Sequence, residues 1–348
     1  MAPTVRTATL MNFAEVARQF GLNPARLVRQ MGLDPRVLTL TDLRIPAAKV
    51  VALLEAAALE SECETFGLRM AESRRLSDFG ALSLLITHQP TLREVLTTLG
   101  QYRHLVNETL IIQVEETASA VVVREDLLLT SPTGARQAYE LAVGVLVRIF
   151  RALLGARWRP LSVEFTHGAP RDLSVHHRLF GHEVIFDSDF NGVVCSLADL
   201  DRANPSADPV MAGYARNFVD TLPRAGQRSI LGEVQKAIHL LLPTGQATLE
   251  RVAESIGVPQ RTLQRRMADQ GADFRQVLDE VRCDLALRFV ANEAFTLTRV
   301  SQLLGYSQSS TFTRWFHGRF GLAPSDWRRR EAAGGAGVAA PVRPGGVG

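Results

Sequence analysis

Three hydrogen-bonding side chains lie within about one turn of a helix predicted near the C-terminus: Arg261, Gln264 and Arg265. Arg can donate two parallel hydrogen bonds to O6 and N7 of guanine, and Gln can pair in the same way with N6 and N7 of adenine. A second predicted helix carries hydroxyls and one cation, namely Ser309, Ser310, Thr311, Thr313 and Arg314. Hydroxyls suit phosphates or mixed base contacts, and Arg314 can read guanine or bind a phosphate.

Both sets of side chains belong to a tandem repeat of residues 249–267 and 297–316. The two windows match at an offset of 48 residues and, after one extra residue in the second turn, at 49. The matched pairs are Val252 and Val300, Ile256 and Leu304, Gly257 and Gly305, Val258 and Tyr306, Leu263 and Phe312, Arg265 and Arg314, and Met267 and Phe316.

Each window predicts two short helices that meet at a steep angle. Apolar residues at i and i+4 form one face of the first helix, and a glycine able to take the left-handed conformation ends it. One apolar residue then fills the corner, and the second helix buries two more. This is the pattern of a helix-turn-helix unit, in which the second helix enters the major groove of DNA.

The formal charge of the chain is unevenly distributed. Residues 221–330 contain 16 Lys and Arg against 10 Asp and Glu, a net charge of +6, whereas the rest of the chain contains 23 against 26, a net charge of −3. A basic block suits a polyanionic partner, although chance alone gives many domains such a charge. Solvated faces of ordinary helical hairpins are the alternative interpretation of the repeat. Two tandem copies, each with a Gly corner and a matching Arg, favour the DNA-binding interpretation.

A long amphipathic helix is predicted between the two units, over residues 274–289. Its apolar stripe consists of Phe274, Leu278, Val281 and Leu285, with Val277 beside it. Such a helix can hold the two units at a fixed separation, so that both recognition helices enter successive major grooves about 34 Å apart.

The first two-thirds of the chain predict an α+β domain. Residues 1–105 are mostly helical in pattern, with Pro46 near the start of one helix and a capping box from Thr91 to Glu94 at the start of another. Strands are predicted at 109–115, 120–125, 161–165, 183–186 and 192–195, and helices at 132–154 and 210–221. Mixed helices and strands followed by helices alone indicate an α+β domain and then an all-α domain.

These patterns set the expected domain boundaries. Residues 1–222 form a sensing and dimerisation domain, 223–228 a linker, and 229–330 a DNA-binding domain with helix-turn-helix units at 249–270 and 297–320. Residues 331–348, rich in Gly, Ala, Pro and Val, are expected to be a disordered tail.

Other chemistry finds little support in the sequence. The three cysteines, Cys63, Cys195 and Cys283, form no ligand or disulfide pattern. His176, His177 and His182 lack a nearby pair of carboxylates, so no metal site is expected. No GxSxG, P-loop or GxGxxG motif occurs, and we assign no catalytic residue and no cofactor. No signal peptide and no membrane-spanning run are recognised, so a cytoplasmic protein is expected.

Two further patterns are left without a function. Residues 13–34 imitate a third helix-turn-helix, with Arg26 and Arg29 on its second helix, but packing inside the sensor is favoured because the segment lies far from the basic block. A set of polar residues near predicted core elements could line a pocket, but a structural role is favoured for each: Tyr102, Arg103, His104, Arg136, Tyr139 and Glu140. The ligand-binding residues remain unassigned.

The C-terminal block resembles the AraC/XylS family of bacterial transcription regulators. Residues 303–316 (LLGYSQSSTFTRWF) are similar to the second helix-turn-helix of that family, and residues 321–328 (GLAPSDWR) to its closing Gly-x-x-Pro-x-x-x-Arg pattern. Arg282 and Ala286–Leu287 look like its linker-helix pattern. The resemblance implies that groove-facing positions are held by Arg261, Gln264, Arg265, Ser309, Ser310, Thr311, Thr313 and Arg314. Relatives often have larger side chains where this second unit has hydroxyls, which favours base reading by the first unit.

The N-terminal part looks like the arabinose-binding-like sensor domain found in that family, on residues 180–186 (FGHEVIF) and 200–209 (LDRANPSADP). The expected function is therefore a sequence-specific DNA-binding transcription regulator, an activator that responds to a small-molecule metabolite. Promoter or operator DNA and the effector are the expected partners. RNA polymerase is a further candidate partner and a homodimer a candidate assembly.

Two alternatives remain open at this point. One is a DNA-targeted enzyme such as a repair alkyltransferase, which needs an activated cysteine in a basic or ligand-like context. Neither Cys63 nor Cys195 has such neighbours in sequence. The other is a ligand-independent architectural DNA-binding protein.

Overall fold

The computed structural model describes residues 3–128, 134–222, 230–242, 245–292 and 295–332. These residues form two compact units, one before and one after residues 223–229. The segment predicted as a linker, residues 223–228, lies outside the described residues, and so do residues 333–348 of the predicted tail. Residues 331 and 332, also predicted as tail, belong to the last helix instead.

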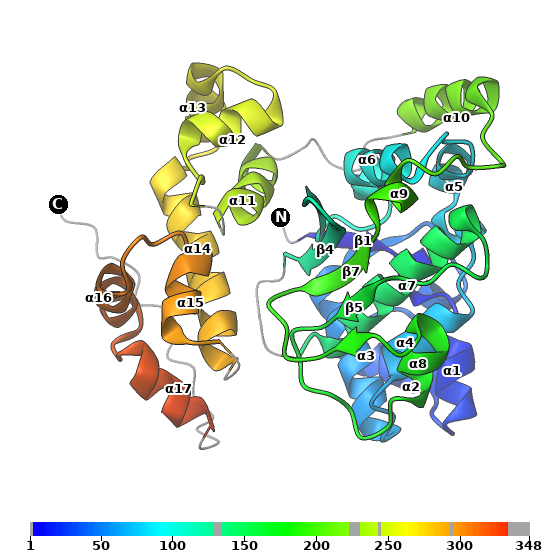
Figure 1. Cartoon of the computed structure of the whole chain (residues 1–348). Coiled ribbons are helices and arrows are strands. Elements are labelled where there is room, and N and C mark those ends of the chain that lie inside the picture. The colour runs from blue at the N-terminus through cyan, green and yellow to red at the C-terminus, as the bar shows by residue number, and fades with distance from the viewer. Residues whose placement is uncertain (1–2, 129–133, 223–229, 243–244, 293–294, 333–348) are drawn as a thin grey trace. The chain divides into compact units, whose positions relative to one another are not determined.

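Helices make up most of the N-terminal unit (Figure 1). They are α1 (Phe13–Gln19), α2 (Pro24–Gln30), α3 (Ala47–Glu60), α4 (Phe66–Glu72), α5 (Ala81–Thr87), α6 (Leu92–Tyr102), α7 (Arg136–Leu154), α8 (Ser174–Phe180), α9 (Leu197–Leu200) and α10 (Pro209–Thr221). Pro46 stands directly before α3, as predicted. α6 also begins where predicted, but its capping box does not form, because the Thr91 hydroxyl donates to the Glu94 carboxylate instead of accepting a backbone N–H of the helix.

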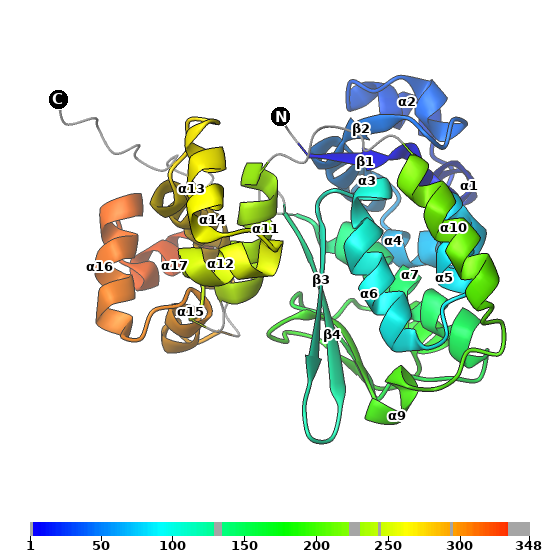
Figure 2. The same cartoon turned by 90° about the horizontal axis from the view of Figure 1, so that it is seen from above.

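Five strands form one sheet in the order β3-β4-β7-β5-β6. Their bounds are β3 (Leu110–Glu116), β4 (Val121–Leu127), β5 (Ser162–Glu164), β6 (Val184–Ile185) and β7 (Asn191–Cys195). β5 and β6 are parallel, and the other neighbours are antiparallel. Figure 2 shows β3 and β4 as a long hairpin. All five strands lie within two residues of their predicted positions.

A second, two-stranded sheet was not predicted. β1 (Thr4–Arg6) pairs antiparallel with β2 (Arg44–Pro46) in the N-terminal unit. Three residues are too few to show the alternation by which a strand is recognised in sequence.

α7 forms the centre of the N-terminal core. It contacts β4 and β7 of the sheet and packs closely against α4. The close approach depends on Gly67 of α4, where a Cβ atom would lie 2.1 Å from the Gln137 carbonyl oxygen. The segment that imitates a third helix-turn-helix packs into the same core, with Phe13, Leu27 and Val28 buried, as favoured from the sequence.

The C-terminal unit described here is entirely helical. Its helices are α11 (Ile230–Leu241), α12 (Leu249–Ile256), α13 (Gln260–Ala268), α14 (Phe274–Ala291), α15 (Leu297–Leu303), α16 (Ser309–Phe320) and α17 (Pro324–Ala332). One continuous hydrophobic cluster joins them. The α+β domain followed by an all-α domain is therefore confirmed. Within the described ranges, no helix is both long and apolar enough to cross a bilayer.

The buried face of α14 differs from the predicted stripe. Val281 and Leu285 are buried as expected, but Phe274 and Leu278 are only partly buried, whereas Val277 is 3% exposed. α14 contacts α11, α15 and α17, so its buried surface extends around the helix instead of forming one narrow stripe.

Candidate functional site

The first helix-turn-helix unit consists of α12 and α13. The Thr248 hydroxyl accepts the Arg251 N–H at 3.3 Å and caps the start of α12. Gly257 ends that helix in the left-handed conformation, at φ +76°. The Val258 N–H then donates to the Ala253 carbonyl at 3.0 Å, which closes the corner. The predicted glycine corner is confirmed here.

The second unit, α15 and α16, repeats this local geometry. Thr296 caps α15 by accepting the Arg299 N–H at 3.1 Å. Gly305 has φ +72°, and the Tyr306 N–H donates to the Ser301 carbonyl at 3.0 Å. Thr248 and Thr296 therefore extend the repeat by one position at its start. Neither threonine was predicted as a cap from the sequence, although threonine is a favoured N-cap residue.

Arg261 and Arg265 lie one turn apart on the outer face of α13. Leu263 and Met267, on the opposite face, are 0% and 1% exposed. Gln264 is exposed at the edge of the same outer face. No hydrogen bond or ion pair joins the side chain of Arg261, Gln264 or Arg265 to another described residue, so all three side chains are available to a ligand. Arg266 is also exposed, on the other flank of α13, and was not predicted as a contact.

α16 carries the second set of predicted DNA contacts. One face of this helix is a buried aromatic ridge of Phe312, Phe316 and Phe320. Ser310 and Arg314 lie one turn apart on the outer face, and both are exposed. Thr311 and Thr313 are exposed on its two flanks. Ser309 is only half-buried in the first turn, and its carbonyl accepts the Thr313 hydroxyl at 2.9 Å. The Thr313 hydroxyl can therefore still accept a hydrogen bond, but its own proton is already donated to the Ser309 carbonyl.

α14 holds the second unit by polar contacts as well as by packing. Asp279 accepts the Trp315 indole N–H at 2.7 Å and lies 3.3 Å from the Arg319 guanidinium. Arg282 donates to the Leu304 carbonyl at 3.2 Å and lies 4.8 Å from the centre of the Tyr306 ring. These contacts fix α15 and α16 on the long helix that the sequence predicted as a spacer. The contacts themselves could not be read from periodicity.

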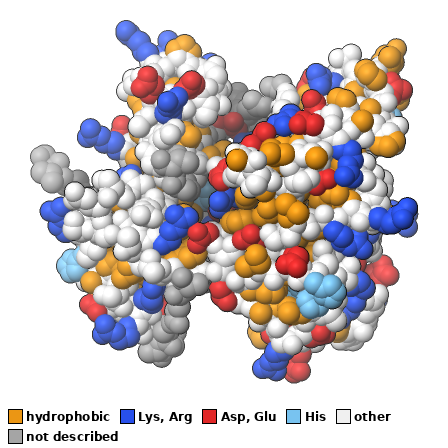
Figure 3. All heavy atoms as spheres, viewed as in Figure 1, with side chains coloured by type: hydrophobic (Ala, Val, Ile, Leu, Met, Phe, Trp, Pro, Cys, Tyr) orange, Lys and Arg blue, Asp and Glu red, His pale blue; other side chains and the backbone are white. Residues whose placement is uncertain are grey.

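Cationic side chains are spread over the outer surface of the C-terminal unit. Figure 3 shows Lys and Arg near α13 and also near α16 and α17. The exposed arginines on these three helices are Arg261, Arg265, Arg266, Arg314, Arg329 and Arg330. A distributed positive surface of this kind suits a phosphate backbone more than one small anion.

A cavity of about 130 Å³ lies in the N-terminal unit. Aliphatic residues of α3, β3, β4 and α7 form most of its wall, including Val50, Leu54, Ile112, Val145 and Ile149. Its ionisable wall residues are Arg74, Asp78 and Glu125. The polar residues weighed for a pocket from the sequence do not occur among its described wall residues. Glu125 was missed, although it continues the inward alternation of Val121 and Val123 on β4.

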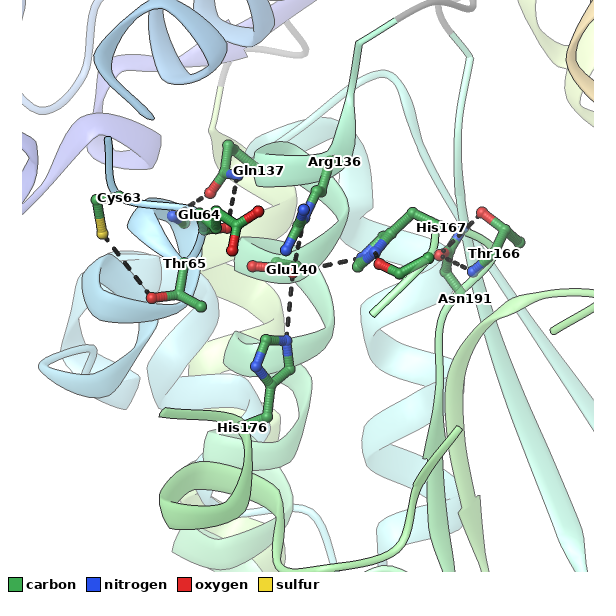
Figure 4. A network of polar contacts seen from close by, with 12 residues as sticks. Cys63, Glu64, Thr65, Arg136, Gln137, Glu140, Thr166, His167, His176 and Asn191 are labelled. Atoms are coloured by element: carbon green, nitrogen blue, oxygen red, sulfur yellow. Dashed lines mark hydrogen bonds and ion pairs between the residues drawn. The ribbon is translucent and has the colours of Figure 1, made fainter. Parts of the chain in front are cut away.

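A separate buried polar network surrounds Glu140 of α7 (Figure 4). Its Oε1 lies 3.2 Å from Arg136 Nε, 3.2 Å from His176 Nε2 and 3.4 Å from His167 Nε2. Burial is the main influence on the His167 pKa and lowers it. Within the described part of the chain, no group of three His, Cys, Asp or Glu residues is arranged to hold a metal ion. The network links α7 to α8 and to the segment after β5.

The three cysteines are free and buried. Burial raises the pKa of Cys195 to about 12 and that of Cys283 to about 11. Because the thiolate is the nucleophilic form, neither thiol is prepared for alkyl transfer. This weakens the alkyltransferase alternative.

A family model described as the arabinose-binding domain of AraC transcription regulators matches residues 21–204, more than half of the chain. The chain belongs to the AraC family. A helix-turn-helix family model matches residues 252–330, which include α13 and α16. The protein is therefore a DNA-binding transcription regulator with a sensor domain for a small molecule, and its family and relatives are regulators, not enzymes.

Several known regulators are similar to this chain. The HTH-type transcriptional regulator VirS of Mycobacterium tuberculosis is 27% identical over 326 residues, which cover 93% of this chain and 96% of VirS. The ornithine utilization regulator of Pseudomonas aeruginosa is 27% identical over 204 residues, which cover 57% of this chain and 59% of that protein. The crystal structure of the transcriptional regulator CdpR from Pseudomonas aeruginosa is 23% identical, covers 88% of this chain and 96% of that one, and has a TM-score of 0.41.

Proposed function

We propose that this AraC-family regulator reads DNA with α13 and anchors itself with α16. The observation that carries the proposal is the pair of exposed, unengaged arginines one turn apart on α13, opposite a buried apolar face. Arg261 and Arg265 have the reach and the donors to pair with guanine, and Gln264 can pair with adenine.

α16 has the chemistry of an anchor. Its outer face carries one cation, Arg314, among short hydroxyl side chains. Ser310 and Thr311 are exposed in its first turn and Ser309 lies next to them, whereas the Thr313 hydroxyl donates to the Ser309 carbonyl. Short hydroxyls reach phosphate oxygens close to the helix, and the positive end of the helix favours the same anions. Base reading is therefore assigned mainly to the first unit and positioning to the second.

The exposed apolar face of α10 is a candidate dimer surface. Val210, Tyr214 and Phe218 follow each other at one-turn intervals on α10 and are 65%, 67% and 52% exposed. Figure 3 shows apolar side chains at this helix. We propose that the same face of a second copy covers this stripe in a homodimer, because a two-fold axis pairs one patch with itself. Sedimentation of the full chain checks this, and a monomer at micromolar concentration would contradict it.

The output of the regulator follows from the same proposal. Effector binding in the N-terminal unit shifts the population of DNA-competent states, since a ligand acts by binding one state more tightly. The protein then activates transcription in the cytoplasm, with RNA polymerase as the partner. The relatives include transcriptional activators by name, such as NphR of Rhodococcus.

Arg265→Ala tests the reading role of α13. The variant should lose about 1–3 kcal/mol of binding free energy on specific DNA and much less on random DNA, with relaxed preference at one base pair. Fluorescence anisotropy on a specific duplex and its single-base variants, at several salt concentrations, measures both effects. Arg314→Ala should weaken both DNAs equally and reduce the salt slope by about one.

Arg329→Ala is the matched control. Arg329 is exposed on α17 and pairs with Asp326, outside both recognition helices. Its loss should leave the base preference unchanged. An equal loss on specific and random DNA for Arg265→Ala would reduce Arg265 to a phosphate contact and refute its reading role.

A further inference from the structure

Glu125 presents an unpaired carboxyl to the cavity of the N-terminal unit. Its side chain lies on the cavity wall, and the residue is 4% exposed. Its Oε2 atom is buried and has no hydrogen-bond partner among the described residues. A buried carboxyl without a partner is costly, so such a group normally marks a site that something else completes.

The other charged wall residues, Arg74 and Asp78, both have polar partners, although the buried Nε of Arg74 has none among the described residues. The Arg74 guanidinium donates to the Ala8 carbonyl at 2.6 Å and also to the Thr9 carbonyl. Asp78 accepts the Arg75 N–H at 3.0 Å and lies 4.0 Å from the Arg74 guanidinium. The strand neighbours of Glu125, Ile112 and Asn191, are uncharged. If Glu125 ionises, its charge is therefore the uncompensated one in the wall.

We propose that this cavity is the effector site and that its ligand is a small, largely apolar amine whose head group meets Glu125. This inference rests on the proposed function in one respect, that the N-terminal unit senses a small molecule. The new elements are the place where the effector binds and the chemical class of the effector. The aliphatic wall takes the body of the ligand, and the Glu125 carboxyl takes its head.

The size of the cavity limits the body of the ligand. A cavity of about 130 Å³ is close to the engineered apolar cavity of about 150 Å³ that binds benzene. One ring or a short branched chain fills such a space. A pentose carries a hydroxyl on most of its carbons, and this wall would leave most of them without a partner.

The charge of the wall selects the head group. Burial raises the pKa of Glu125 to about 8, so the empty site holds a neutral carboxyl at pH 7. An alkylamine is the stronger base, with a pKa near the value of about 10.4 for lysine. On binding, the ammonium keeps its proton and the Glu125 O–H proton leaves to solvent, which creates a charge-assisted hydrogen bond. A carboxylate ligand would instead place a second acid against Glu125.

Four monosubstituted benzenes that share one ring separate these possibilities: benzylamine, benzyl alcohol, toluene and benzoate. Isothermal titration calorimetry of the full chain measures their affinities, with L-arabinose as a sugar probe. We expect benzylamine to bind about 10- to 100-fold more tightly than toluene, since a charged hydrogen bond is added. Benzyl alcohol should fall between them, and benzoate and arabinose should give no measurable binding.

The pH dependence identifies the acid. Because binding releases one proton from neutral Glu125, benzylamine affinity should rise about tenfold per pH unit as pH approaches 8 from below, and then level off. Toluene affinity should not change. Glu125→Gln should abolish the pH dependence and bring benzylamine to the level of toluene. Glu115→Gln, the same change on the neighbouring strand β3 and outside the cavity wall, is the matched control and should bind like the natural protein.

Two further measurements check that the probes bind in this cavity and that each variant is folded. Ala142→Leu adds volume at a wall position and should weaken every probe that binds. The melting temperature of each variant shows that it is folded. Equal binding of benzylamine and toluene, tighter binding of benzoate, or no binding by any probe would overturn the inference. DNA binding that remains intact in the same preparation would leave the proposed function standing.

Discussion

Phe316→Ala should destabilise the C-terminal unit by about 3–5 kcal/mol, the usual cost of removing a fully buried phenyl ring. Phe316 is 0% exposed. Its ring centre lies 4.5 Å from that of Phe320, 5.7 Å from that of Phe312 and 6.2 Å from that of Trp327. Removing this ring opens a cavity between α16 and α17, so α16 should lose its fixed orientation along with its stability.

Native-state hydrogen exchange of the full chain measures this effect unit by unit, because it reports local opening free energies. Exchange should accelerate in α14, α16 and α17 and stay unchanged in α7. His317→Ala, one residue along on the exposed side of α16, should change the stability by less than about 0.5 kcal/mol. Similar exchange in the two variants would show that the aromatic ridge does not hold the recognition helix.

Gly67→Ala should destabilise the N-terminal unit by about 3 kcal/mol, at the upper end of overpacking costs. The added Cβ would lie 2.1 Å from the Gln137 carbonyl oxygen, and that oxygen belongs to the backbone of α7 and cannot rotate away. The Gly67 N–H also donates to the Gln137 side chain at 2.8 Å, a bond that would be lost when α4 moves.

Gly100→Ala provides the opposite control. Gly100 lies within α6, and nothing lies within 4 Å of an added Cβ. The substitution should therefore stabilise the protein by about 0.5–1 kcal/mol, since alanine loses less backbone entropy than glycine in a helix. Urea unfolding followed by circular dichroism measures both variants. A loss of stability in both, or in neither, would contradict the packing described for α4 and α7.

The DNA-binding unit could be predicted well from sequence because its signals are local. Gly257 and Gly305 end helices in the left-handed conformation, and each corner is closed within five residues. The apolar positions of the repeat follow the helical period, and this spacing predicted that Leu263 and Phe312 are buried. The tethers from Asp279 and Arg282 join residues far apart in sequence, and no local pattern contains them.

The sensor cavity depends on long-range assembly in the same way. Glu125 stands at an inward position of β4, but its isolation depends on α3 and α7. The segment around Thr91 shows that a local sequence motif can also mispredict a contact. Its hydroxyl bonds the Glu94 side chain, so a matching motif did not produce the matching contact.

Hydroxyl-radical footprinting on the protein's own operator tests the central claim most directly. The full chain should protect two short segments on one face of the duplex, about one helical turn or 34 Å apart. Arg265→Ala should weaken protection mainly in the segment that α13 contacts, and Arg314→Ala in the other. A single protected segment, or protection without sequence preference, would contradict two helix-turn-helix units acting together on DNA.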